Sequence, residues 1–127
     1  LLIVEDEEIE REGMARFIDW EQFGIEMVGT AWNGAEGLEK IHTLKPDIVI
    51  TDIKMPVMNG RDAARTIRKL HRPDAKTIPI FALSADAFVE DQRLSIESGM
   101  NGHYAKPVDF QALQKNVGMF LEKREKR

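Results

Sequence analysis

Short apolar runs alternate with amphipathic segments along the whole chain. Two of these runs, residues 1–4 and 48–50, are continuous, and continuous apolar runs are typical of strands that are buried on both faces, as in a parallel sheet. The pattern predicts strands at residues 1–4, 26–31, 48–51, 78–83 and 103–105. The second strand is the weakest, and the glycines near it favour a position at the edge of the sheet.

Amphipathic helices are predicted between the strands. Ile9, Gly13 and Phe17 recur at every fourth position, so we expect a helix over about residues 7–18 with its charged residues facing outward. The next helix begins with the pattern of a capping box, Asn33 followed by Glu36. The apolar residues on one face of that helix are Leu38, Ile41 and Leu44.

The later helices follow the same logic. Asn59-Gly60 precedes a third helix, whose apolar positions are Ala63, Ala64, Ile67 and Leu70. A fourth covers about residues 87–98, and Asp109 caps the last helix, which carries the clearest apolar stripe: Phe110, Leu113, Val117 and Phe120. Five strand-plus-helix units imply right-handed crossovers, and therefore an α/β fold with a doubly wound parallel sheet.

Length and composition narrow the functions that such a fold could serve. A chain of 127 residues fits one domain, and a net charge of −4 does not suggest a nucleic-acid-binding surface. The absence of cysteine excludes disulfides and thiolate ligands, which suits the cytoplasm. No segment reads as a signal peptide or a membrane span, and the chain begins inside a predicted strand, so we expect a few residues to precede it.

Polar residues follow four of the predicted strands. Glu5 and Asp6 come after the first strand, Asp52 after the third, Ser84 after the fourth and Lys106 after the fifth. The carboxyl ends of parallel strands meet at one edge of the sheet, where ligands bind in open α/β folds. Each residue alone has an ordinary structural explanation, such as a helix cap, a surface charge or an acidic first helical turn. Their joint occurrence at four strand ends indicates a functional site.

Three carboxylates at one edge predict a bound cation. Glu5, Asp6 and Asp52 would raise one another's pKa unless a cation lay among them, and Mg²⁺ suits a site with few carboxylates, several waters and a phosphate. With Mg²⁺ and the Lys106 ammonium nearby, the Asp52 carboxylate stays ionised and can attack a phosphorus atom. The same cations would offset the charge of the transferred phosphoryl group, and the Ser84 hydroxyl could donate to one of its oxygens.

Four blocks of the sequence resemble the signature motifs of receiver domains of two-component signalling systems. They are Val4-Glu5-Asp6-Glu7, residues 51–60 (TDIKMPVMNG), Leu83-Ser84-Ala85 and Ala105-Lys106-Pro107. This resemblance implies a flavodoxin-like (βα)5 fold with the strand order 2-1-3-4-5. It also implies a receiver domain over residues 1–123, followed by a charged tail or the start of a linker over residues 124–127.

The resemblance also implies a role for each residue of the phosphorylation site. Asp52 would be the phosphoacceptor, and the phosphoryl group would come from a histidine on a histidine kinase or a histidine phosphotransfer protein. Asp6 and Asp52 would bind Mg²⁺ directly, Glu5 would bind it through water, and Lys54 would contribute its backbone carbonyl. Lys106 would pair with the aspartyl phosphate.

A conformational switch is implied as well. The Ser84 hydroxyl would move toward the phosphoryl group, and His103 occupies the position of an aromatic residue that turns inward behind it. An imidazole there could make the switch pH-sensitive. The Lys106-Pro107 bond is expected to be cis. The readout surface would be the fourth helix, the fifth strand and the last helix, and a homodimer through the fourth helix stays open.

Three other functions compete with this one. A phosphatase of the haloacid dehalogenase type needs a second acidic residue two positions after its nucleophile, where this chain has Lys54. A flavin-binding electron carrier shares the fold, but residues 5–8 are all acidic and would repel a flavin phosphate. The remaining alternative is a degenerate receiver that acts only as a protein-binding module. We expect a signalling domain rather than an enzyme, with slow autodephosphorylation at most.

The parent protein has two candidate classes. Residues 18–34 resemble receivers of transcriptional response regulators, whereas residues 72–80 and 98–101 resemble receivers fused to hybrid histidine kinases. Because the second resemblance is the longer one, we expect a receiver from a hybrid kinase, with a transcription regulator as the alternative. Either parent would add an output or kinase domain to this chain.

Overall fold

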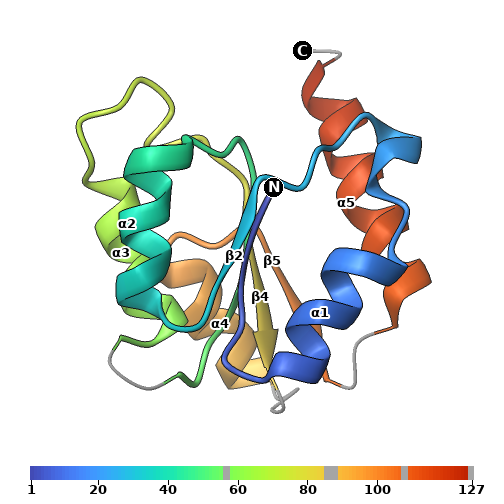
Figure 1. The fold of residues 1–127 in the computed structure, drawn as a ribbon. Helices are drawn as coiled ribbons and strands as arrows, with labels where there is room; N and C mark the ends of the chain where they lie inside the picture. The colour runs from blue at the N-terminus through green and yellow to red at the C-terminus, as the bar shows by residue number, and fades with distance from the viewer. Residues whose placement is uncertain (56–57, 85–88, 107–108, 126–127) are drawn as a thin grey trace.

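A five-stranded parallel sheet with helices on both sides forms the structure (Figure 1). The computed structural model describes residues 1–55, 58–84, 89–106 and 109–125, without the side chains of residues 23, 89–91 and 121–125. The strands are β1 (Leu2–Val4), β2 (Gly29–Ala31), β3 (Val49–Asp52), β4 (Ile80–Ser84) and β5 (Gly102–Ala105). The helices are α1 (Glu8–Phe17), the 3₁₀ helix η1 (Trp20–Phe23), α2 (Gly34–Leu44), α3 (Gly60–Arg68), α4 (Val89–Glu97) and α5 (Phe110–Glu125).

The order of the strands is β2-β1-β3-β4-β5, and every neighbouring pair is parallel. This confirms the doubly wound topology and the flavodoxin-like order that the resemblance implied. It also confirms that the weak second strand lies at the edge of the sheet. That strand begins at Gly29 rather than at residue 26, so it is shorter than predicted.

Two hydrophobic cores lie on opposite faces of the sheet, because successive strand residues point to opposite sides. Ile3, Ile50 and Phe81 belong to the core under α1 and α5, whereas Leu2 and Val49 belong to the core under α2 and α3. Figure 1 shows these helix pairs on either side of the sheet. Burial on both faces explains why β1 and β3 read as continuous apolar runs.

The predicted helix caps are present. The Asn33 side chain accepts a hydrogen bond from the Glu36 backbone at 2.9 Å, and the Glu36 carboxylate accepts one from the Trp32 N–H at 3.1 Å, which completes the capping box one residue earlier than usual. Asp109 accepts hydrogen bonds from the first backbone N–H groups of α5. These local bonds fix where α2 and α5 begin.

Gly60 allows the chain to turn back tightly after β3. Its N–H donates to the carbonyl of Ile53 at 2.8 Å, and a Cβ atom at this position would lie 2.1 Å from the Asp52 carbonyl oxygen. Only glycine can make so close an approach. The start of α3 is thereby anchored against the end of β3, which carries the predicted phosphoacceptor.

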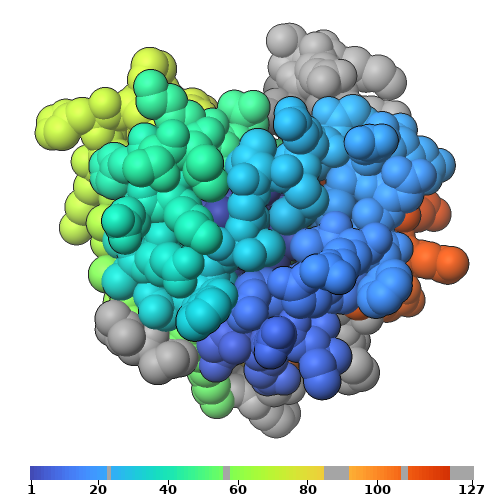
Figure 2. Space-filling view, viewed as in Figure 1, coloured from blue at the N-terminus to red at the C-terminus, as the bar shows by residue number. Residues whose placement is uncertain are grey.

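The predicted orientation of the first helix is wrong, although its position is right. Ile9 and Phe17 are 89% and 79% exposed, whereas Arg11 and Met14 are buried. Arg11 is buried because its Nη1 donates to the Glu5 carbonyl at 3.0 Å and its guanidinium lies over the Trp32 ring, 5.4 Å from the ring centroid. Figure 2 shows this face of the molecule, with α1 and α2 on either side of β2.

Two other segments differ in detail from the prediction. The break after α1 is the helix η1, which buries Trp20 while the indole Nε1 donates to the Met14 carbonyl at 2.9 Å. Leu44, predicted on the apolar face of α2, is 41% exposed at the end of that helix. Within the part of the chain that the structure describes, no helix combines the length and hydropathy that crossing a membrane requires.

Candidate functional site

Asp52 is the last residue of β3 and lies at the carboxyl edge of the sheet, as predicted. Its side chain is buried, and its Oδ1 accepts a hydrogen bond from the Ile53 backbone N–H at 2.9 Å. Its Oδ2 accepts one from the Lys106 ammonium at 3.2 Å. A backbone N–H and an ammonium therefore both contact this carboxylate.

Glu5 follows β1 directly, and its side chain is fully buried. Its Oε1 accepts hydrogen bonds from the Glu7 backbone N–H at 3.2 Å and from Lys106 at 3.0 Å. Its Oε2 is also buried and has no hydrogen-bond partner among the residues that the structure describes. A cation, or the water around it, is the kind of partner that such an oxygen needs.

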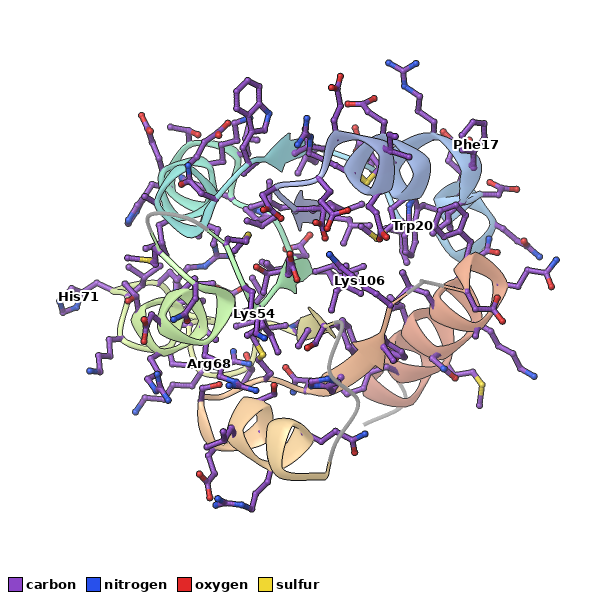
Figure 3. All side chains as sticks on the ribbon, turned by 90° about the horizontal axis from the view of Figure 1, so that it is seen from below. Phe17, Trp20, Lys54, Arg68, His71 and Lys106 are labelled. Carbon is purple, nitrogen blue, oxygen red and sulfur yellow. The ribbon has the colours of Figure 1, made fainter. Side chains whose placement is uncertain are left out.

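Lys106 joins the two carboxylates. Its backbone N–H donates to the Ser84 carbonyl at 2.8 Å, which fixes it directly after β5. Its ammonium lies 3.0 Å from Glu5 Oε1, 3.2 Å from Asp52 Oδ2 and 3.7 Å from Glu7 Oε1. Figure 3 looks onto this edge of the sheet, and shows Lys106 near the middle of the strand ends.

Burial and mutual repulsion alter the titration of these groups. Burial raises the pKa of Glu5 to about 8, and the charge of Asp52 adds to that rise. Burial also raises the pKa of Asp52 to about 6; the charge of Lys106 opposes this rise and a hydrogen bond with Asp6 adds to it. Burial lowers the pKa of Lys106, but its contacts with Glu5 and Asp52 outweigh burial and raise it overall. Two carboxyl groups thus compete for one ammonium, and Glu5 is the one that ionises less readily.

The same edge has the oxygen ligands for a divalent cation. Carboxylate oxygens of Glu5, Asp6 and Glu7 lie within 4.8 Å of one another, and Asp6 also interacts with Asp52. A donor set made only of oxygen atoms, with one buried oxygen unpartnered, fits Mg²⁺. Glu7 was not predicted as a site residue. The unbroken acidic run of residues 5–8 is the signal that could have indicated it.

Ser84 and His103 lie on the neighbouring strands. Ser84 is the buried last residue of β4, one position beyond Leu83, which pairs with Asp52 across the sheet. His103 lies in β5, and its Nδ1 is 3.1 Å from the hydroxyl oxygen of Ser95 on α4. The switch roles assigned to Ser84 and His103 stay predictions, as does the role of the Lys54 carbonyl. The predicted cis bond between Lys106 and residue 107 lies outside the described residues.

Comparison with known proteins places the chain among signalling regulators. It matches the family model of the response regulator receiver domain over residues 1–118. It is 33% identical over 113 residues to the transcriptional regulatory protein YesN of Bacillus subtilis, covering 89% of this chain and 30% of that protein. It is 32% identical over 126 residues to the transcriptional regulatory protein BtsR of Escherichia coli, covering 99% and 49%. The chain therefore spans half or less of the length of these relatives.

Solved structures share the fold. The receiver domain of the Francisella response regulator 1452 has a TM-score of 0.82 at 24% identity, covering 97% of this chain and 96% of that chain. The chemotaxis protein CheY4 of Vibrio cholerae has a TM-score of 0.79 at 28% identity, covering 91% and 92%. These similarities agree with the strand order and with the sequence blocks at the strand ends. The chain belongs to the response regulator receiver domain family.

Proposed function

We propose that this chain is a phosphoacceptor in a two-component phosphorelay, in which Asp52 takes a phosphoryl group from a histidine on a kinase or a histidine phosphotransfer protein. One observation carries the proposal: the Lys106 ammonium contacts both Glu5 and Asp52 at one sheet edge. A lone buried aspartate after a strand would support no such role. A buried aspartate that shares a cation with a second carboxylate is suited to receive a charged group.

The proposed reaction is an in-line displacement at phosphorus. An Asp52 oxygen forms a bond to phosphorus while the bond from phosphorus to the donor imidazole breaks, and the electron pair of that bond stays on the imidazole nitrogen, which takes up a proton. The carboxylate must be ionised to attack. Because the pKa of Asp52 is raised only to about 6, most of the carboxylate is ionised at neutral pH.

Charge compensation is the main task of the surrounding residues. The Lys106 ammonium, already 3.2 Å from an Asp52 oxygen, would form an ion pair with the new phosphoryl oxygens. The Ser84 hydroxyl would donate a hydrogen bond to one of them. Mg²⁺ would be held by Asp6 and Asp52 directly, by Glu5 through water and by the Lys54 carbonyl. When bound, it would offset charge on the phosphoryl group.

The output of phosphorylation would be a population shift at α4, β5 and α5. His103 contacts Ser95 across the interface between β5 and α4, so a movement of the imidazole would change this contact with α4. We propose that the domain signals by this shift and performs no small-molecule turnover beyond slow loss of its own phosphoryl group.

The similar proteins indicate which kind of parent protein would contain this receiver. YesN and BtsR are transcriptional regulatory proteins, and each is longer than the matched region. This favours a transcription regulator over the hybrid kinase that the sequence placed first. We propose a cytoplasmic parent protein that joins this receiver to an output domain.

Intact-mass measurement with acetyl phosphate and Mg²⁺ tests the proposal. The wild type is expected to gain one phosphoryl group, an Asp52→Asn variant none, and an Asp47→Asn variant as much as the wild type. Asp47 is the matched control because it is exposed and precedes β3 at the other end of the strand. An adduct on Asp52→Asn would overturn the assignment of the acceptor.

A negative result would have a defined meaning. If the wild type gained no mass, and beryllofluoride with Mg²⁺ also left its spectra unchanged, the chain would be a degenerate receiver that only binds partners.

A further inference from the structure

A groove of ≈ 690 Å³ lies between the end of α2 and the segment that connects α3 to β4. Its residues precede β3 and β4, so it lies at the opposite end of the sheet from Asp52, which ends β3. Figure 1 shows the connecting segment at the far end of the molecule from the tip of β4, and Figure 3 shows His71 at the outer edge beyond α3. The volume is that of sites that bind small organic molecules.

The walls of the groove are apolar. They include Ile41 of α2, and Leu70 and Pro73 of the connecting segment. Ile41 is buried in the core under α2 and α3, and Leu70 packs against the same core. The groove is therefore continuous with a rigid core, and an apolar body bound there would cover carbon surface that faces solvent.

The rim of the groove is cationic. Lys45, Lys69 and Arg72 line it together with two histidines, and Asp74 is the one acidic residue among them. Arg72 pairs with Asp74, whereas neither Lys45 nor Lys69 has an ion pair within the described ranges. In a chain with a net charge of −4, this is a local excess of positive charge.

Two features define the rim, the backbone at Lys45 and the anchored guanidinium of Arg72. Lys45 has left-handed backbone angles, φ 49° and ψ 57°, at the C-cap of α2. Arg72 donates through Nη2 to the Pro46 carbonyl at 2.9 Å, which ties the connecting segment to the end of α2. The Nη1 of Arg72 is buried, and the described residues offer it no hydrogen-bond partner.

We propose that this groove binds a small aromatic carboxylate. The ring would lie against Leu70 and Pro73, above the buried Ile41, and the carboxylate would lie between Lys45 and Lys69. An inorganic anion would leave the apolar walls uncovered, and a neutral aromatic molecule would leave the cations uncompensated. A ligand with an aromatic ring and a carboxylate covers the apolar walls and pairs with the cations of the rim.

Amide chemical shifts of the full chain, titrated with 2-naphthoate, test the proposal. Saturable shifts are expected at residues 41–45 and 69–74 and not around Asp52. Acetate, which has the charge alone, and 2-naphthylmethanol, which has the ring alone, are each expected to bind at least tenfold more weakly. Equal binding of the alcohol, or shifts centred on another region, would overturn the proposal.

Two double variants distinguish binding by the rim lysines from attraction of the ligand by the overall charge of the protein. The double variant Lys45→Asn, Lys69→Gln is expected to weaken 2-naphthoate binding at least fivefold, and asparagine tolerates the left-handed backbone at position 45. The control is Arg16→Gln, Lys115→Gln, which removes the same charge from exposed positions on α1 and α5 and should leave binding unchanged. An equal loss in both double variants would refute the site.

The choice of a small molecule has its own test. Tighter binding of the peptide acetyl-Glu-Phe-Glu-amide than of 2-naphthoate at the same amides would assign the groove to an acidic protein segment instead. Phosphorylation by acetyl phosphate should be unchanged in the Lys45→Asn, Lys69→Gln variant, because Asp52 lies at the other end of the sheet.

Discussion

Lys106 contacts Glu5 at 3.0 Å and Asp52 at 3.2 Å, so one ammonium serves two buried carboxylates. Because two carboxylates share one ammonium, the two carboxyl groups ionise in different pH ranges. Asp52 stays largely ionised at neutral pH, while Glu5, with a pKa of about 8, holds its proton until a cation arrives. Binding of Mg²⁺ would therefore release a proton from the site.

The stability of the metal-free protein is expected to fall as the pH rises from about 5 to 8. The pKa of Glu5 is raised from 4.5 to about 8, so the folded state binds more protons than the unfolded chain across this range. By the linkage relation, the Glu5 contribution to this dependence amounts to about 3.5 kcal/mol of unfolding free energy. A Glu5→Gln variant should lose that contribution and keep the smaller one that the raised pKa of Asp52 makes near pH 6. Urea denaturation in EDTA at several pH values measures it.

The control for this experiment is Glu8→Gln, at an exposed position of the same acidic run, which should keep the wild-type slope. A wild-type unfolding free energy that increases from pH 5 to 8 would show that Glu5 is ionised in the folded state without a metal. Addition of Mg²⁺ should flatten the slope of the wild type, because the ion stabilises the ionised carboxylates.

Glu5 and Asp52 lie at the strand ends where the sequence predicted them, because the apolar runs of β1 and β3 are easy to detect, and Lys106 follows β5 as predicted. The roles of these residues stay predictions. The sequence did not locate Arg11, whose guanidinium is buried against the Glu5 carbonyl and the Trp32 ring. A charged residue inside an amphipathic pattern is normally assigned to the exposed face. Only the position of its hydrogen-bond acceptor, which is set by tertiary structure, shows otherwise.

Among the elements, α1 shows how a short pattern can mislead. Ile9 and Phe17 suggested an apolar stripe, yet the buried positions are Arg11, Gly13 and Met14. In a helix of ten residues, two large apolar side chains are too few to define a face.

Substitutions in α1 distinguish the two faces. Met14→Ala is expected to lower the unfolding free energy by about 3 kcal/mol, because Met14 is fully buried and its loss leaves a cavity. Ile9→Ala and Phe17→Ala should each change it by less than about 0.5 kcal/mol. Urea denaturation measures all three variants. A large loss on Ile9→Ala with none on Met14→Ala would restore the orientation that the sequence suggested.

Arg68, in the last turn of α3, connects three parts of the chain through its guanidinium. Its guanidinium donates to Ile78 at 2.7 Å, to Gly99 at 2.6 Å and to the Asn101 side chain at 2.9 Å. Asn101 in turn bonds the backbone of Ile80 at the start of β4. The end of α3, the entry to β4 and the turn after α4 therefore share one cation.

Removal of this cation should be costly. Arg68→Ala is expected to lower the unfolding free energy by about 2 kcal/mol, because several acceptors lose their donor at once. Arg65→Ala in the same helix should cost less than about 0.5 kcal/mol, since Arg65 makes an exposed ion pair with Asp62. Thermal and urea unfolding measure the difference. Equal losses would mean that Arg68 acts only as a surface charge.

For the molecule as a whole, the alternation of strands and helices was enough to predict a doubly wound sheet, but not the order of its strands. The order came from the resemblance to receiver domains, and the structure confirms it. Local patterns specify which segments are strands, whereas their neighbours depend on how distant segments pack. The hydrophobic pattern of β1 gives no sign that its neighbours are β2 and β3.

The rate of amide hydrogen exchange should depend on whether a strand lies at the centre or at the edge of the sheet. Every residue of β1, β3 and β4 is buried, whereas β2 and β5 form the edges and are partly exposed. We expect the amides of the three central strands to exchange at least about tenfold more slowly than those of the edge strands, because they open only with the whole domain. Exchange measured by NMR or mass spectrometry tests this. Uniform protection across the sheet would contradict it.

The bond between Lys106 and Glu5 spans 101 positions of sequence, and the bond to Asp52 spans 54. A ribosome makes both carboxylates long before it makes their cation. A nascent chain that ends before β5 contains four of the five strands, yet its acidic residues have no Lys106 ammonium between them. The last strand to leave the ribosome thus also brings the charge that the first and third strands require, and completion of the sheet and neutralisation of its edge become a single step of biosynthesis.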